Sequence, residues 1–245
     1  MKWIAPDAIA NDYFSICNEV IHSNDFGMFK RDTRYNNIVG MSTHQQLIYW
    51  IDLYRNDLDV NKNLNSIKKN DISMPPGMTN TDFGFISPST MRYVNTSKEI
   101  MKYLGPFENI DVLEIGVGYG GLAYVLSHFI EMNTYKSVDL DFVQKLADIY
   151  LKNLGFSKHT PHHDGISDLL ISEFCFSEFD DGYMNSLFES YFTKTKNFYL
   201  VMNLHDSYRK NYWKDKLSEL FTVVEYQENP TTQWPNYVWC GTKNK

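Results

Sequence analysis

Residues 112–123 read VLEIGVGYGGLA, which is an apolar strand ending in Glu114, a turn with four glycines and the start of a helix. Glycine lets a backbone turn sharply and approach a ligand closely, and the first turn of a helix presents free N–H groups to a polar or anionic group. Asp139 lies about 18 residues beyond Gly121, where an acidic side chain can accept hydrogen bonds from both hydroxyls of a ribose. The stretch therefore predicts a site for a nucleotide-type cofactor.

Strand and helix patterns alternate around this turn. Short apolar runs predict buried strands at 110–116, 135–140, 169–174 and 197–204. Apolar residues at helical spacing predict helices at 122–132, 141–155, 184–192 and 212–220. Two further runs, 222–228 and 236–243, flank a loop with proline and predict a closing antiparallel hairpin. The fold class is therefore α/β, with a doubly wound, mostly parallel seven-stranded sheet and a C-terminal antiparallel hairpin.

The N-terminal part of the chain has a different pattern. Residues 7–64 carry apolar side chains in helical stripes, whereas residues 61–84 are rich in Asn, Lys, Pro and Gly, which is typical of turns and loops. We therefore place a boundary near residue 75. Residues 1–75 form a helical segment that either folds over the acceptor or pairs with a second subunit in a homodimer, and residues 76–245 form the ligand-binding domain.

Composition excludes several classes of protein. The 245 residues carry a net charge of −7, which argues against binding an extended nucleic-acid backbone. The three cysteines are far apart and include no CxxC pair, so neither a disulfide framework nor a structural zinc site is indicated. No apolar run approaches the roughly 20 residues that span a bilayer, and the N-terminal stretch lacks a signal-peptide core. We expect a cytoplasmic protein with a small-molecule partner and no membrane or nucleic-acid partner.

The glycine turn fits two cofactors. Gly116, Gly118 and Gly121 satisfy the GxGxxG pattern of dinucleotide-binding proteins. Glu114, two residues before the first glycine, instead favours S-adenosylmethionine, because a carboxylate there attracts a sulfonium amino acid and repels a pyrophosphate. The predicted terminal hairpin also differs from the two mononucleotide-binding halves of a dehydrogenase. We therefore expect S-adenosylmethionine as the cofactor.

The sequence resembles the class I methyltransferases, and among them the sugar O-methyltransferases found with polysaccharide and glycoside biosynthesis. The similar stretches span roughly residues 75–180 and are ISPSTMRY (86–93), VLEIGVGYGGLA (112–123), VDLDFVQKLADIYL (138–151) and ISEFCFSEFD (171–180). Asp141 and Glu173 depart from the family, which tends to have Pro and often has Asn at these positions. The resemblance implies a methyl donor and a sugar or sugar-nucleotide acceptor.

The predicted donor site uses the glycine turn and the loops after the next two strands. We assign to it Glu114, Gly116, Gly118, Tyr119, Gly120, Asp139, Leu140 and Asp164. Tyr119 either faces the cofactor or packs beneath the turn. Asp164 ends the stretch HTPHHD (159–164), whose His spacing fits no standard metal signature, so we expect no metal and a loop around the adenine.

Transfer to a sugar hydroxyl calls for a base near the carboxyl ends of the strands. Glu178 is the first candidate for this role and Glu173 a weaker one, although Glu178 also suits a plain helix start. His205, followed by Asp206, is a competing base or an ordinary loop histidine. Arg92 and Tyr93 are placed to reach the donor carboxylate or the acceptor. An N-methyltransferase acting on an amino sugar and a non-catalytic nucleotide-binding module remain the alternatives.

Overall fold

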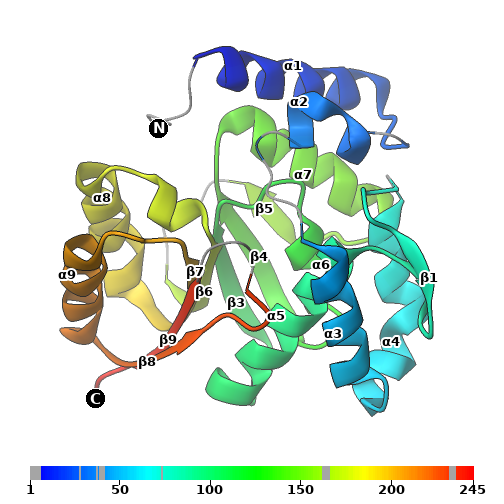
Figure 1. Ribbon diagram of the computed structural model, residues 1–245. Helices are drawn as coiled ribbons and strands as arrows, with labels where there is room; N and C mark the ends of the chain where they lie inside the picture. The colour runs from blue at the N-terminus through cyan, green and yellow to red at the C-terminus, as the bar shows by residue number, and fades with distance from the viewer. Residues whose placement is uncertain are drawn as a thin grey trace.

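The computed structural model describes residues 7–27, 29–36, 38, 42–72, 74–161, 166–231 and 236–245. Its centre is a seven-stranded sheet in the order β5-β4-β3-β6-β7-β9-β8 (Figure 1). The strands are β3 (Ile110–Ile115), β4 (Met132–Val138), β5 (His159–Pro161), β6 (Ser167–Glu173), β7 (Thr195–Met202), β8 (Phe221–Gln227) and β9 (Tyr237–Lys243). Strands β3 to β7 pair in parallel, whereas β9 is antiparallel to β7 and β8. The predicted fold class is confirmed.

Helices cover both faces of this sheet. They are α5 (Pro88–Leu104), α6 (Gly121–Leu126), α7 (Asp141–Asn153), α8 (Asp181–Tyr191) and α9 (Ser207–Ser218). One hydrophobic core lies under α5, α6 and α7, and a second lies under α8 and α9. Figure 1 shows α8 and α9 together on one side, with α6 on the other. Because β3 is buried from both faces, Val112 and Leu113 are fully buried and the strand is almost continuously apolar.

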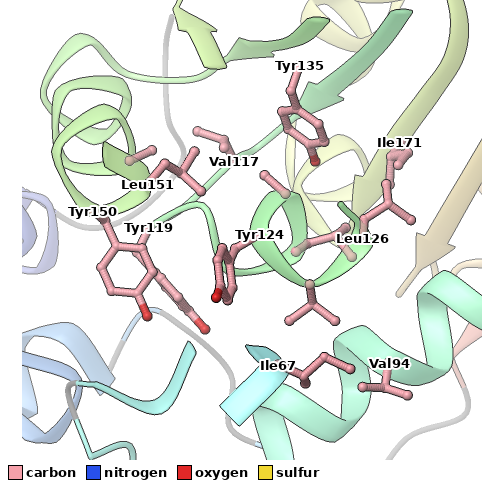
Figure 2. Close-up of a cluster of buried hydrophobic side chains, with 14 of the residues drawn as sticks. Ile67, Val94, Val117, Tyr119, Tyr124, Leu126, Tyr135, Tyr150, Leu151 and Ile171 are labelled. Carbon is pink, nitrogen blue, oxygen red and sulfur yellow. The ribbon is translucent and has the colours of Figure 1, made fainter. Parts of the chain in front are cut away.

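Where the N-terminal segment is described, it contains four α-helices. They are α1 (Asp7–Ser23), α2 (Thr33–Asn36), α3 (His44–Tyr54) and α4 (Leu58–Ile67). Helix α1 packs on α7 and α3 packs on α5. Trp50 and Val60 are fully buried in the same core as the helices on that face of the sheet, and Figure 2 shows Ile67 in one cluster with Val94 and Leu126. The segment and the sheet therefore share a hydrophobic core.

One predicted helix was much too long, and three short strands were not predicted. The run 122–132 was predicted as one helix, but α6 ends at Leu126 and β4 already begins at Met132. In the turn between them Ile130 is buried, at 3% exposed, and the apolar Phe129 and Ile130 continue the helical pattern past the end of the helix. The three-residue strand β5 was not predicted, and neither were β1 (Thr79–Thr81) and β2 (Gly84–Ile86), which form a small hairpin in the predicted loop. Within the described ranges, no helix is long and apolar enough to cross a bilayer.

Candidate functional site

A cavity of about 470 Å³ opens at the carboxyl ends of β3, β4, β6 and β7. Parallel strands bring these ends together: Glu114 pairs with Ser137 of β4 and with Ile171 of β6. The size is within the usual range for a small-molecule site. The wall includes the predicted residues Arg92, Tyr93, Glu114, Gly116, Gly118, Tyr119, Asp139, Leu140, Glu173, Glu178 and His205. The fold therefore gathers residues that are more than 100 positions apart in the sequence.

The glycine turn forms part of this wall. Gly116, Gly118 and Gly120 have φ angles of 87°, 52° and 89°, a region that favours glycine. A Cβ atom at Gly116 would collide with Cys175, which follows β6. A Cβ atom at Gly118 would meet nothing within 4 Å, so the backbone there faces open space. Gly116 thus permits close packing against the loop after β6, and Gly118 leaves room for a ligand.

Two acidic side chains lie on either side of the turn in the sequence, and both line the cavity. Glu114 is 3% exposed and accepts a hydrogen bond of 2.6 Å from the Tyr135 hydroxyl. Burial raises the pKa of Glu114 to about 8. Asp139 accepts from the backbone N–H of Gly118 at 3.1 Å and from that of Leu140 at 2.7 Å. Burial raises the pKa of Asp139 to about 6, and these hydrogen bonds oppose that rise.

The opposite part of the wall follows β6. Glu173, the last residue of that strand, accepts a hydrogen bond from the Thr96 hydroxyl. Burial raises the pKa of Glu173 to about 6, although the nearby Arg92 guanidinium opposes the rise. Glu178 ends a short 3₁₀ turn (Cys175–Glu178), and partial burial raises its pKa as well. The side chain that caps α8 is that of Asp180, so Glu178 does not serve the helix start as a cap.

The loop after β7 contributes His205. Its side chain lines the cavity, as predicted for a residue at the carboxyl end of a strand. The neighbouring Asp206 caps α9, because its Oδ1 accepts from the backbone N–H of Arg209 at 2.7 Å. One carboxylate oxygen of Asp206, the neighbour of the candidate base His205, is therefore engaged in capping α9.

No protein-family model matches the sequence, and no curated protein matches it. Solved structures do match the fold. A methyltransferase from Pyrococcus furiosus aligns with a TM-score of 0.51 and 13% identity, over 82% of this chain and 98% of that one. The N-methyltransferase NodS from Bradyrhizobium japonicum aligns with a TM-score of 0.51 and 12% identity, over 64% of this chain and 97% of that one. The chain has the class I methyltransferase fold.

In this methyltransferase fold, Tyr119 packs beneath the glycine turn while it also lines the cavity. A Cβ atom at Gly121 would collide with the Tyr119 ring, and the ring of Tyr150 lies 5.0 Å away, centroid to centroid. The Lys30 ammonium lies 3.6 Å from the centroid of the Tyr119 ring. Figure 2 shows Tyr119 and Tyr150 side by side. Most contacts of the Tyr119 ring therefore agree with the alternative in which it packs beneath the glycine turn.

Lys30 is a cavity residue that the sequence analysis missed. It is 3% exposed, and its Nζ donates to the backbone carbonyl of Asn70 at 2.9 Å and to the Tyr150 hydroxyl at 3.2 Å. Burial lowers the pKa of Lys30 to about 7. Nothing in the local sequence indicates this burial, because Lys30 and Arg31 together look like an ordinary exposed basic pair.

Arg92 has a partner that the sequence did not reveal. Its Nη2 forms an ion pair with Glu228, which directly follows β8, and its guanidinium lies 4.7 Å from the centroid of the Phe174 ring. The Asn236 amide donates to the other oxygen of Glu228 at 2.7 Å. Glu228 thus joins Arg92 and Asn236, which both line the cavity. The predicted hairpin already places residues 228 and 236 opposite each other, whereas no local motif predicts the contact of Glu228 with Arg92.

The stretch HTPHHD lies partly outside the described residues. Asp164, assigned to the adenine, is among the residues that are not described, as are His162 and His163. His159 belongs to β5 and is 8% exposed, with its Nε2 2.9 Å from the Ser137 hydroxyl. It is a buried sheet residue. Among the described side chains, no group of three or more His, Cys, Asp or Glu residues is arranged to hold a metal ion.

Proposed function

We propose that the protein transfers a methyl group from S-adenosylmethionine to a hydroxyl of a sugar or glycosylated metabolite. The observation that carries the proposal is the glycine turn, which opens at Gly118 into a cavity lined by Glu114 and Asp139. A buried carboxylate with a raised pKa is stabilised by a nearby cation, and the sulfonium and ammonium groups of the donor are cations. A pyrophosphate at the same place would be repelled. The methyltransferase fold supports the same reading.

Each side of the cavity has a role in this proposal. Bound S-adenosylmethionine supplies an electrophilic methyl group on a sulfonium. Glu114 would hold the cationic part of the donor, and Asp139 would accept hydrogen bonds from the ribose hydroxyls. The N-terminal segment and α5 contribute residues to the wall and would help to exclude water, and most of the rate acceleration would come from holding donor and acceptor in line. The acceptor proton would pass to Glu178 or His205, both of which line the cavity.

Donor binding is the first prediction. Isothermal titration calorimetry should show S-adenosylmethionine binding to the wild type and binding at least about tenfold more weakly to Asp139→Ala, because the ribose hydroxyls lose a charged acceptor. Asp82→Ala is a charge-matched control, since Asp82 is exposed in the turn between β1 and β2. Equal affinities for wild type and Asp139→Ala would contradict the ribose assignment, and saturable binding of NADH in a fluorescence titration would favour the dinucleotide alternative.

The base assignment is the second prediction. In a methyl-transfer assay against a panel of sugars and glycosides, Glu178→Gln should lower kcat by about 10²-fold or more, with donor affinity unchanged. His205→Asn, assayed in parallel, decides between the two candidates, because only the base should show the larger loss. Unimpaired turnover in Glu178→Gln would favour an amine acceptor, which needs no strong base when it arrives neutral. Absence of product from every acceptor would favour a non-catalytic module.

A further inference from the structure

Asn203 lines the cavity, and the proposed function gives it no role. It directly follows β7, and it lies between Met202 and Leu204, which are buried in the core under α8 and α9. Asn203 itself is partly exposed on the cavity wall. A polar side chain therefore interrupts a buried apolar run at the point where that run reaches the cavity.

One end of the Asn203 amide is held by the loop after β6. Ser177 is 3% exposed, and its hydroxyl oxygen lies 2.6 Å from Asn203 Oδ1 and 2.7 Å from the Phe174 carbonyl oxygen. The same hydroxyl oxygen accepts from the backbone N–H of Asn203 at 3.3 Å. These contacts orient the amide beside the 3₁₀ turn that ends in Glu178. The amide thus joins the loop of Glu178 to the strand that leads to His205.

The other end of the amide is open. Among the described residues, Nδ2 of Asn203 has no hydrogen-bond partner, and this atom is not fully buried. Because the residue lines the cavity, the two N–H donors of Nδ2 are available to a bound molecule. The matching group is an oxygen with a free lone pair. An ammonium group has no lone pair and cannot accept these hydrogen bonds.

We propose that Asn203 binds the acceptor, with Nδ2 donating a hydrogen bond to a hydroxyl oxygen of a neutral sugar that lies between the loops of Glu178 and His205. The proposal rests on the proposed function and deepens it, because it names a residue that positions the acceptor. Methyl transfer requires the acceptor oxygen to lie in line with the bond between sulfur and methyl group. An amide that the protein already holds in place loses little conformational freedom when the sugar binds.

The test uses the full-length protein saturated with S-adenosylhomocysteine. Saturation-transfer difference NMR measures the affinities for glucose, galactose, mannose and rhamnose, and at least one of them should bind the wild type. Asn203→Leu, which has a similar shape but no N–H donor, should bind that sugar at least about tenfold more weakly. Its affinity for S-adenosylhomocysteine, measured by isothermal titration calorimetry, should not change. Asn65→Leu, which replaces an exposed amide of α4 outside the cavity, should match the wild type for both ligands.

Deoxy analogues of the bound sugar distinguish direct contact from a structural role. Removing the hydroxyl that Nδ2 binds should weaken binding to the wild type at least about tenfold. In Asn203→Leu the same deoxy sugar should bind as well as the parent sugar, because the partner of that hydroxyl is already missing. A variant that only disturbs the cavity wall would instead keep the wild-type ratio of parent to deoxy affinity for every analogue.

The outcomes separate this inference from the proposed function. If S-adenosylhomocysteine does not bind the wild type, the proposed function fails and the inference fails with it. If a sugar binds the wild type and Asn203→Leu equally well, or if the ratio of parent to deoxy affinity is unchanged in the variant for every analogue, only the inference is overturned. Binding of none of the four sugars also overturns it. Should Asn203→Leu fail to bind S-adenosylhomocysteine and so prove misfolded, Asn203→Asp, which keeps Oδ1 and lacks the N–H donors, replaces it with the same expected losses.

Discussion

Glu114 is buried next to a tyrosine hydroxyl and has no ion-pair partner among the described residues. Because its pKa rises to about 8, the folded chain binds this proton more tightly than the unfolded chain. The stabilising contribution is complete below about pH 4.5 and is lost as the pH rises through about 8. Stability without ligand should therefore fall between these values. The carboxylate that would receive a cationic donor thus destabilises the empty fold at neutral and alkaline pH.

This gives the third residue-level prediction. Glu114→Gln keeps a hydrogen-bond acceptor for Tyr135 and removes the titration, so its Tm should exceed that of the wild type by about 3 °C or more at pH 8 and differ little at pH 4.5. Differential scanning fluorimetry across this pH range measures the effect. Glu108→Gln, an exposed carboxylate on the surface, should follow the wild-type curve. A Glu114→Gln curve parallel to the wild type would show that this group does not titrate abnormally.

Local sequence predicts some residues of the site and misses others for a physical reason. Glu114 and the glycines lie in one strand–turn–helix unit, and Asp139 directly follows the next strand. Short stretches of sequence therefore suffice to predict these residues. Lys30 lines the cavity through a tertiary contact with Tyr119, and Glu228 affects the cavity only through its ion pair with Arg92. Neither lies in a pattern that indicates burial. Their roles depend on which helix lies over which strand.

At the scale of elements, α5 depends on a single buried carboxylate. Asp71 accepts hydrogen bonds from the backbone N–H of Ser87 at 2.9 Å, from the Ser87 hydroxyl at 2.6 Å and from the Thr90 hydroxyl at 2.7 Å. Ser87 in turn caps α5 by accepting from the Thr90 backbone N–H. This network fixes the start of the helix that carries Arg92 and Tyr93.

Removing that carboxylate is the next prediction. Asp71→Ala leaves three donors without their acceptor in a buried place, so the free energy of unfolding from urea denaturation should fall by about 3 kcal/mol. Asp71→Asn, which keeps one acceptor oxygen, should lose less. Asp82→Ala on the exposed turn should change stability by no more than about 0.5 kcal/mol. A loss from Asp71→Ala as small as that of the control would mean that the network does not hold α5 in place.

Apolar periodicity predicts some of the helices and strands and misses others. The strands β3, β6 and β7 and the helix α7 were predicted nearly at their true positions, because each is long and its apolar pattern is regular. The end of α6 was missed, since the apolar residues of the turn after it keep the helical pattern. Strand β5 has only three residues, which is too short for alternation to show, and it exists through its pairing with Tyr135, Lys136 and Ser137 of β4.

At the scale of the whole molecule, the N-terminal segment is the part whose place in the site the sequence indicated least. The sequence predicted helices and a boundary near residue 75, and the helices are present. The boundary and the roles of lid or dimer contact stay predictions. Tyr13, Lys30 and Tyr35 of this segment line the cavity together with the glycine turn. The segment therefore supplies part of the cavity wall. An amphipathic pattern cannot indicate this, because it shows which face of a helix is buried but not which element that face packs against.

The position of β9 has a consequence for synthesis of the chain. This strand is translated last of the seven but lies between β7 and β8. While the ribosome still holds its residues, β8 has no neighbour in the sheet, and Trp239, fully buried in the finished fold, is missing from its core. The nascent polypeptide therefore cannot complete this sheet until β9 has left the ribosome. A frameshift in the codons of β9 should be as damaging as one in the codons of β3.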